Sequence, residues 1–110
     1  MSISMSISAG VGSINNDPIV SGAPINVLAP ELRGTFISGS SVGCKTGEWL
    51  NDPIVYKYQW YRNEDVIFGE ETDRYILTSD DIDTTISCLV IAINAFGKGS
   101  EFSNGVYITE

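Results

Sequence analysis

The sequence predicts an all-β fold, an antiparallel sandwich or barrel, and two observations carry this prediction. First, short runs rich in β-branched and aromatic residues are separated by turn residues, and the chain shows no convincing helical period. Second, side chains in the longest runs alternate in character, which is typical of a strand with two different faces. The predicted strands are residues 25–29, 34–38, 41–45, 54–62, 65–68, 73–78, 84–94 and 101–109.

The first 23 residues differ in composition from the rest of the chain. They are rich in Ser, Ile, Gly and Asn, open with a tandem "MSIS-MSIS", and contain one charged side chain, Asp17. We interpret residues 1–23 as an N-terminal arm, either flexible or anchored to a partner, and residues 24–110 as the folded domain. An anchored arm adds to a sheet edge or groove of its partner, where apolar side chains fill pockets. The candidates for that role are Ile3, Ile7, Val11, Ile19 and Val20.

Turn signals mark the connections between the predicted strands. The stretch "NDPIV" occurs at 16–20 and again at 51–55, but the similarity extends no further. We therefore interpret both copies as one local device, an Asn-Asp-Pro turn that leads into a strand. Residues 61–66 and 94–101 have the composition of hairpin tops.

The strand at 54–62 carries large aromatic residues on one side. Because residues i and i+2 of a strand share a face, Tyr56, Tyr58 and Trp60 lie together, with polar residues opposite. We expect Trp60, at the end of this face, to be a core residue between two sheets.

The strand at 84–94 is apolar on both sides. One side includes the predicted core residues Ile86 and Val90, and the other includes Leu89 and Ile91. This pattern predicts a central strand whose outer face is also covered, so Leu89 and Ile91 are candidates for contact with a partner.

The order Cys44, Trp60, Cys88 is typical of an immunoglobulin-type sandwich. In that fold a cysteine on the second strand faces one on the sixth, and a tryptophan from the third packs against the pair. We therefore expect the cysteines to be adjacent in a core that also holds Tyr75 and Leu77; the alternative is two unrelated buried cysteines. Adjacent thiols form a bridge only in an oxidising compartment, and zinc is disfavoured because the chain has no His.

These residues also carry a family resemblance. From about residue 24 to 108 the chain resembles the Ig-like domains of phage virion proteins and bacterial surface proteins, over the stretches 29–49, 56–97 and 103–108. The matching residues are Gly34, Gly39, Cys44, Gly47, Trp49, Tyr58, Gln59, Trp60, Ile67, Gly69, Tyr75, Leu77, Asp81, Ile86, Cys88, Val90, Ala92, Asn94 and Gly97. The resemblance implies an immunoglobulin-like antiparallel β-sandwich, and because the matching residues are structural it implies no binding site.

The chain departs from the family pattern at two places. Asp83 stands where the family often has glycine, and residues 50–54 form a local insertion. Aspartate tolerates left-handed backbone geometry better than most residues, so we expect the turn at Asp83 to be preserved.

Composition excludes several classes of function. Six basic and fourteen acidic residues give a net charge of −8, which disfavours nucleic acid and anionic membrane as partners. Without His or a recognisable nucleophile motif the sequence predicts neither an enzyme nor a cofactor. The acidic stretch Asp80, Asp81 and Asp83 allows a calcium site as the alternative to a solvated corner, and we favour the corner, with Asp81 capping a turn.

The resemblance, together with a start that does not read as a secretory signal, leads to an expected function. We expect a non-enzymatic structural protein of a tailed-phage virion, made in the host cytoplasm, displayed on the capsid or tail surface, and held to phage structural proteins by its arm. Host-surface polysaccharide is a second expected partner. The alternative is a bacterial cell-surface adhesion or carbohydrate-binding module, with a stacking face drawn from Tyr56, Tyr61, Trp49 or Phe96.

Overall fold

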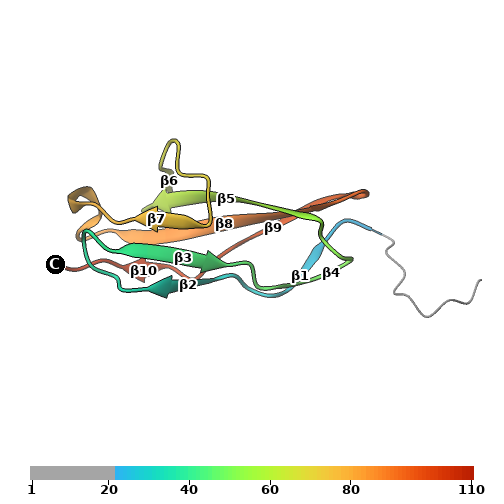
Figure 1. Ribbon diagram of the computed structural model, residues 1–110, viewed down its shortest axis with the longest axis horizontal. Helices are drawn as coiled ribbons and strands as arrows, with labels where there is room; N and C mark the ends of the chain where they lie inside the picture. Colours follow the sequence, from blue (N-terminus) through green and yellow to red (C-terminus); the bar gives the residue numbers. More distant parts are fainter. Residues whose placement is uncertain (1–21) are drawn as a thin grey trace, which may run out of the picture.

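The computed structural model describes residues 22–110, which form an elongated all-β domain of antiparallel strand pairs, as predicted (Figure 1). A single turn of 3-10 helix, η1 (Ser79–Asp81), precedes the longest strand. The strands are β1 (Ile25–Leu28), β2 (Glu31–Gly34), β3 (Ser41–Lys45), β4 (Glu48–Leu50), β5 (Val55–Arg62), β6 (Asp65–Val66), β7 (Arg74–Ile76), β8 (Thr85–Asn94), β9 (Gly97–Phe102) and β10 (Val106–Tyr107).

The strands form two main sheets and one small one. In the first sheet β3 lies between β2 and β7. In the second, β8 is central: β5 pairs along one edge of it and β6 follows β5, while β9 and β10 pair along its other edge. Strands β1 and β4 pair separately, and Figure 1 shows them near the same end of the molecule as the β8–β9 hairpin, with the C-terminus at the opposite end.

The two main sheets share one hydrophobic core. Buried side chains from β3 and β7 contact buried side chains from β5 and β8, so the apolar face of each sheet is covered by the other. The residues predicted for the core are all buried: Trp60, Tyr75, Leu77, Ile86 and Val90. The structure adds Leu32, Val42 and Ile108, which the sequence did not single out.

Trp60 is the central residue of this core and is fully buried. It lies directly opposite Cys88 in the β5–β8 ladder, and its ring stacks on Tyr75 at a centroid distance of 5.5 Å. Its indole N–H donates to the carbonyl of Thr72 at 2.8 Å, so the polar atom of the ring is satisfied. Burial of an indole stabilises a fold by about 3–5 kcal/mol.

The two cysteines are neighbours in the core. Cys44 on β3 and Cys88 on β8 are both buried free thiols that belong to the same core cluster. The neighbouring thiol of Cys44, together with burial, raises the pKa of Cys88. The two cysteines therefore lie together in the core with Trp60, as the sequence predicted.

A buried carboxylate anchors the C-terminal end of β5. Asp81 accepts hydrogen bonds from Arg62 Nε at 2.7 Å, from the Tyr75 hydroxyl at 2.7 Å and from the backbone N–H of Thr78 at 2.8 Å. Burial raises the pKa of the Asp81 carboxyl, but these three bonds outweigh it and hold that pKa below its ordinary value. Burial and the bond to Asp81 raise the pKa of Tyr75 to about 12. Asp81 caps η1, as predicted.

The structure differs from the predicted strands at β2, at the run 34–38, at β4 and at the run 101–109. Most of β2 lies before the run at 34–38, and the sequence did not predict it. The run at 34–38 is not a strand: β2 ends at Gly34, whose φ is 137°, and only an isolated bridge forms, at Ile37. The three residues of β4 are too few to show an alternation, and the sequence missed this strand. The run at 101–109 divides into the end of β9 and β10, because Ser103 turns inward to bond the backbone of Cys88.

The five glycines that contribute to the family resemblance lie where the backbone has a positive φ, which glycine adopts most easily. All five have positive φ: Gly34, Gly39, Gly47, Gly69 and Gly97. The tightest case is Gly47, where a Cβ atom would lie 2.1 Å from the carbonyl oxygen of Leu28. Asp83 also has a positive φ, 65°, so the turn keeps its left-handed geometry without glycine.

Candidate ligand-binding site

The outer face of the β5–β8–β9 sheet carries a row of half-buried side chains from β8. From Ile86 to Asn94 the side chains of β8 alternate strictly: one is buried toward the core, and the next is half-buried on the outer face. Leu89 and Ile91 belong to this outer row, where Leu89 lies between Gln59 on β5 and Phe102 on β9. The sequence predicted a covered outer face, and the structure shows a row that is half-covered by its own neighbours.

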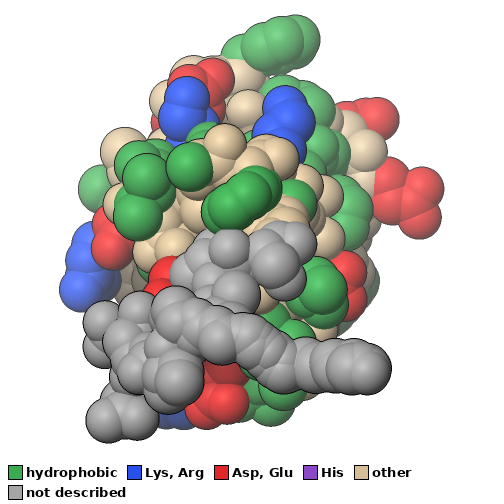
Figure 2. Space-filling model, turned by 90° about the vertical axis from the view of Figure 1, so that its right-hand side faces the viewer, with side chains coloured by type: hydrophobic (Ala, Val, Ile, Leu, Met, Phe, Trp, Pro, Cys, Tyr) green, Lys and Arg blue, Asp and Glu red, His purple; other side chains and the backbone are tan. Residues whose placement is uncertain are grey.

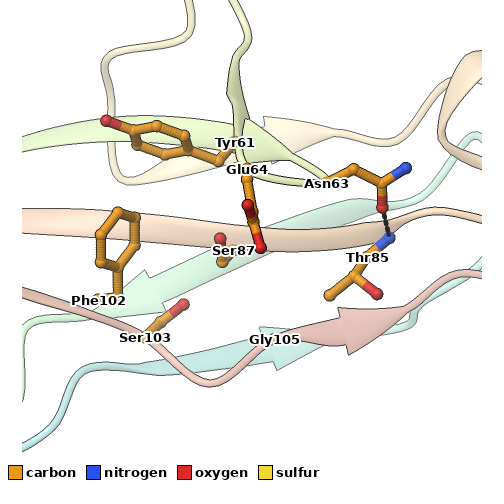
Figure 3. A pocket seen from close by; sticks show the side chains of 8 residues that line it. All are labelled: Tyr61, Asn63, Glu64, Thr85, Ser87, Phe102, Ser103 and Gly105. Carbon is orange, nitrogen blue, oxygen red and sulfur yellow. Dashed lines mark hydrogen bonds between the residues drawn. The ribbon is translucent and has the colours of Figure 1, made fainter.

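A pocket of about 670 Å³ opens at one end of this face, and we call it the β5–β6 pocket (Figure 3). Its volume lies within the range of roughly 300–1,000 Å³ that is usual for small-molecule sites. Strands β5, β8 and β9, the β5–β6 turn and the segment between β9 and β10 contribute its walls. The lining residues are Tyr61, Asn63, Glu64, Thr85, Ser87, Phe102, Ser103 and Gly105.

Two aromatic rings form one side of the β5–β6 pocket. Tyr61 and Phe102 meet edge to face, with centroids 5.1 Å apart and planes at 69°. They come from strands on opposite sides of β8, and they meet over it because the outer side chains of the sheet project in one direction. Phe102 is 47% exposed, so much of its ring is available to a ligand.

The turn between β5 and β6 supplies the polar side of the pocket. Arg62 pairs with Asp65, so Asn63 and Glu64 form a two-residue hairpin loop. Both have positive φ, 50° and 81°, which is the pattern of a type I′ turn. The Asn63 side chain accepts a hydrogen bond from the backbone N–H of Thr85 at 2.9 Å, which ties the turn to β8.

Glu64 extends from this turn into the β5–β6 pocket. Figure 3 shows its carboxylate over β8 near Ser87, between the aromatic pair and the Asn63–Thr85 bond. Glu64 takes part in neither of the two ion pairs found within residues 22–110. No Lys or Arg lines the pocket, so the carboxylate is the only charged group in its wall.

A second surface feature lies at the opposite end of the domain, at β1, β4 and the β8–β9 turn. Figure 2 shows apolar side chains on this end. We call these residues the apolar end: Ile25, Val27, Leu28, Leu50, Ile54 and Phe96, each between 54% and 73% exposed. Side chains of this size are usually exposed in a group only where they meet another surface.

The structure separates the four aromatic residues that the sequence offered as a stacking face. Tyr61 lines the β5–β6 pocket, and Phe96 belongs to the apolar end. Trp49 and Tyr56 are half-buried and pack against the core, and the Trp49 indole N–H donates to the carbonyl of Thr46 at 2.7 Å. Only Tyr61 of these four reaches the candidate site.

The remaining predicted residues have structural positions or fall outside the description. Asp81 is buried in the hydrogen-bond network with Arg62, which leaves the acidic corner without a shared ligand set. The predicted arm residues lie outside residues 22–110: Ile3, Ile7, Val11, Ile19 and Val20.

Sequence reasoning missed Glu64 and Phe102 as site residues. Phe102 was assigned to a strand running to residue 109, and its pairing with Leu89 follows only from the register of β9 on β8. For Glu64 a signal was present: a two-residue hairpin loop that begins with Asn ordinarily continues with Gly, and this chain has Glu.

Comparison with known proteins found no relative: the chain matches no protein-family model, no curated protein and no solved structure. Across residues 22–110, no helix is long and apolar enough to cross a membrane. The same part of the chain holds no group of three or more His, Cys, Asp or Glu side chains placed to share a metal ion.

Proposed function

We propose that the chain is a non-enzymatic Ig-like structural protein of a tailed-phage virion, a decoration or accessory protein displayed on the capsid or tail surface. The order of the strands supports the Ig-like assignment: β2, β3 and β7 have the positions of strands A, B and E, and β5, β8 and β9 those of C, F and G. Cys44, Trp60 and Cys88 then fall on strands B, C and F.

The observation that carries the proposal is that the two ends of the domain have different surfaces. The apolar end lies where residues 1–21 join the domain, and the β5–β6 pocket lies toward the end that holds the C-terminus (Figure 1). A displayed domain needs one end that attaches and another that faces outward. In this proposal the N-terminal segment and the apolar end contact a phage structural protein, and the pocket faces the medium.

A non-enzymatic role agrees with the chemistry of the domain. The chain has no His, and Asp81, the buried carboxylate, is engaged by Arg62 and Tyr75. The two thiols are buried in the core with Trp60, away from the surface. None of these groups is available as a general base or nucleophile to a bound substrate.

Immunogold electron microscopy of particles from the source culture tests the proposal. Gold on heads or on tails is the expected result and gives the site of display. Gold on cell envelopes with bare particles would instead favour the alternative, a bacterial cell-surface adhesion or carbohydrate-binding module. That alternative has one specific observation in its favour, the aromatic pair of Tyr61 and Phe102 at the β5–β6 pocket.

A matched pair of variants tests attachment through the apolar end. Leu28 and Ile76 are both exposed, at 56% and 64%, but Ile76 lies on the edge strand β7, outside the apolar end. We expect Leu28→Asp to lower the occupancy of the protein on particles and Ile76→Asp to leave it unchanged. Equal occupancy for both variants would contradict attachment through this end.

A further inference from the structure

We propose that the β5–β6 pocket binds a neutral saccharide, with the sugar ring stacked on the Tyr61–Phe102 pair and its hydroxyl groups bound by the Glu64 carboxylate. The proposal names the ligand of the display domain and rests on the proposed function only for its biological setting. Binding in solution tests it independently of where the protein is displayed.

The aromatic pair fits the apolar face of a sugar ring. Pyranose rings present C–H groups on one face, and these pack against aromatic rings that are held in place. Tyr61 and Phe102 hold each other edge to face at 5.1 Å, and each is fixed by a strand paired to β8. A ligand therefore meets a rigid apolar surface at little cost in side-chain entropy.

The polar groups of the pocket fit hydroxyl groups. Glu64 supplies two acceptor oxygens, and Ser87 carries a hydroxyl near it (Figure 3). Thr85 adds a second hydroxyl to the lining, and both hydroxyls can donate and accept. This set of partners matches a ligand with several adjacent O–H groups. A carboxylate accepting from a hydroxyl makes one of the stronger kinds of hydrogen bond in proteins.

Charge argues against an anionic ligand. The one charged group in the pocket wall is a carboxylate, and the whole chain carries a net charge of −8. A phosphate or a sialic-acid carboxylate would meet this field without a Lys or Arg to offset it. A neutral sugar avoids the repulsion, and a cation is the competing possibility that the experiment separates.

The backbone at Glu64 points to a role outside folding. Its φ of 81° is a conformation that glycine adopts freely and that other residues adopt at a cost. Glycine at this position would complete the Asn-Gly type I′ turn, so the hairpin gains nothing from glutamate. Its carboxylate is instead placed in the pocket, and backbone strain of this kind is found at functional sites.

Asp52 provides a matched control within the same chain. It is an exposed carboxylate that follows an asparagine, and it too has a positive φ, 48°. It precedes β5 and lies at the other end of that strand from Glu64, outside the β5–β6 pocket. Asp52→Gly and Glu64→Gly therefore make the same change in charge and backbone freedom, and only Glu64→Gly alters the pocket.

The test is saturation-transfer NMR of the full chain with methyl glycosides of glucose, galactose, mannose and N-acetylglucosamine, followed by titration of the best binder. We expect at least one to bind at millimolar concentration. Glu64→Gly should weaken that binding roughly tenfold or more, the effect of one lost charge-assisted hydrogen bond, while Asp52→Gly leaves it unchanged. Both variants should raise the melting temperature, which shows that the loss of binding is not a loss of folding.

Glu64→Gln and a cationic probe complete the design. Because glutamine keeps the acceptor oxygen, Glu64→Gln should retain part of the affinity for a neutral sugar, and tetramethylammonium should not displace the sugar. Absence of binding by all four glycosides would overturn the proposal. So would equal affinity for Glu64→Gly and the wild type, or displacement of the sugar by tetramethylammonium.

Discussion

Strand β5 is bounded by two connections that each hold an asparagine followed by an acidic residue with positive φ. Asn51–Asp52 precedes the strand and Asn63–Glu64 follows it, and all four residues have positive φ. At both turns the asparagine has a structural partner: the Asn51 amide donates to the carbonyl of Ala23 at 2.9 Å, and the Asn63 side chain accepts from Thr85 N–H.

The acidic residues distinguish the two turns. Both are exposed, but Asp52 lies at the end of the domain near β1, whereas Glu64 lines a pocket beside an aromatic pair. Packing and backbone bonding account for the asparagines and for the strand between the turns. They do not account for a glutamate in a left-handed turn, which the ligand proposal explains.

Substitution of two neighbouring residues of β5 by alanine should lower the free energy of unfolding by very different amounts. We expect Trp60→Ala to lower the free energy of unfolding by about 3–5 kcal/mol, because it removes a fully buried indole and leaves a cavity. Tyr61→Ala, one residue along on the outer face, should cost about 1 kcal/mol, because its ring is only half-buried. Urea unfolding measures both, and similar losses would contradict the assignment of inner and outer faces.

At the C-terminal end of β5, Asp81→Asn should cost about 2–3 kcal/mol, because it breaks the buried pair with Arg62. The pKa of the Asp81 carboxyl is lowered in the folded protein, so its contribution to stability is present above pH about 4, the ordinary carboxyl range, and is lost as pH falls through the folded value. Unfolding measured between neutral and acid pH should show this loss in the wild type. If the stability of Asp81→Asn falls with pH in the same way, the loss comes from other carboxyl groups and not from Asp81.

The two asparagines, Asn51 and Asn63, should contribute about equally to the stability of the domain. Asn51→Ala and Asn63→Ala each remove a side-chain hydrogen bond and place alanine at positive φ, and we expect each to cost about 1–2 kcal/mol. Asn63→Gly removes only the bond and should cost less than Asn63→Ala. Thermal unfolding of the three variants measures these differences, and an unchanged melting temperature for Asn63→Ala would contradict the structural role of that side chain.

Replacing the acidic residue that follows each asparagine should change the free energy of unfolding in the opposite direction. Glu64→Gly and Asp52→Gly should each raise the free energy of unfolding by about 0.5–1 kcal/mol, because glycine adopts positive φ without strain. Differential scanning calorimetry resolves shifts of this size. A destabilised Glu64→Gly would mean that the glutamate serves the fold, and it would remove the argument from strain.

Much of the core could be predicted from the sequence because alternation and spacing are local signals. The two-residue period of residues 54–62 placed Trp60 on the inner face, and the order of Cys44, Trp60 and Cys88 placed the cysteines together. The register of Trp60 opposite Cys88 agrees with both signals.

The candidate pocket could not be predicted because it depends on long-range register. Phe102 reaches Tyr61 only because β9 pairs with β8 so that Leu89 lies opposite Phe102. The hairpin top at 61–66 was visible in the sequence, but the direction of the Glu64 side chain depends on the turn type and on the Asn63 bond to β8.

On this proposal the domain meets a ligand at the outer face beside the β5–β6 turn, and not at the Asn51–Asp52 connection. The most direct test is to record ¹H–¹⁵N NMR spectra of the full chain during titration with the glycoside that binds best. We predict shifts concentrated at Tyr61, Glu64 and Phe102, with the resonances of Asp52 unmoved. Shifts centred on the apolar end, or spread evenly over both turns, would contradict the account.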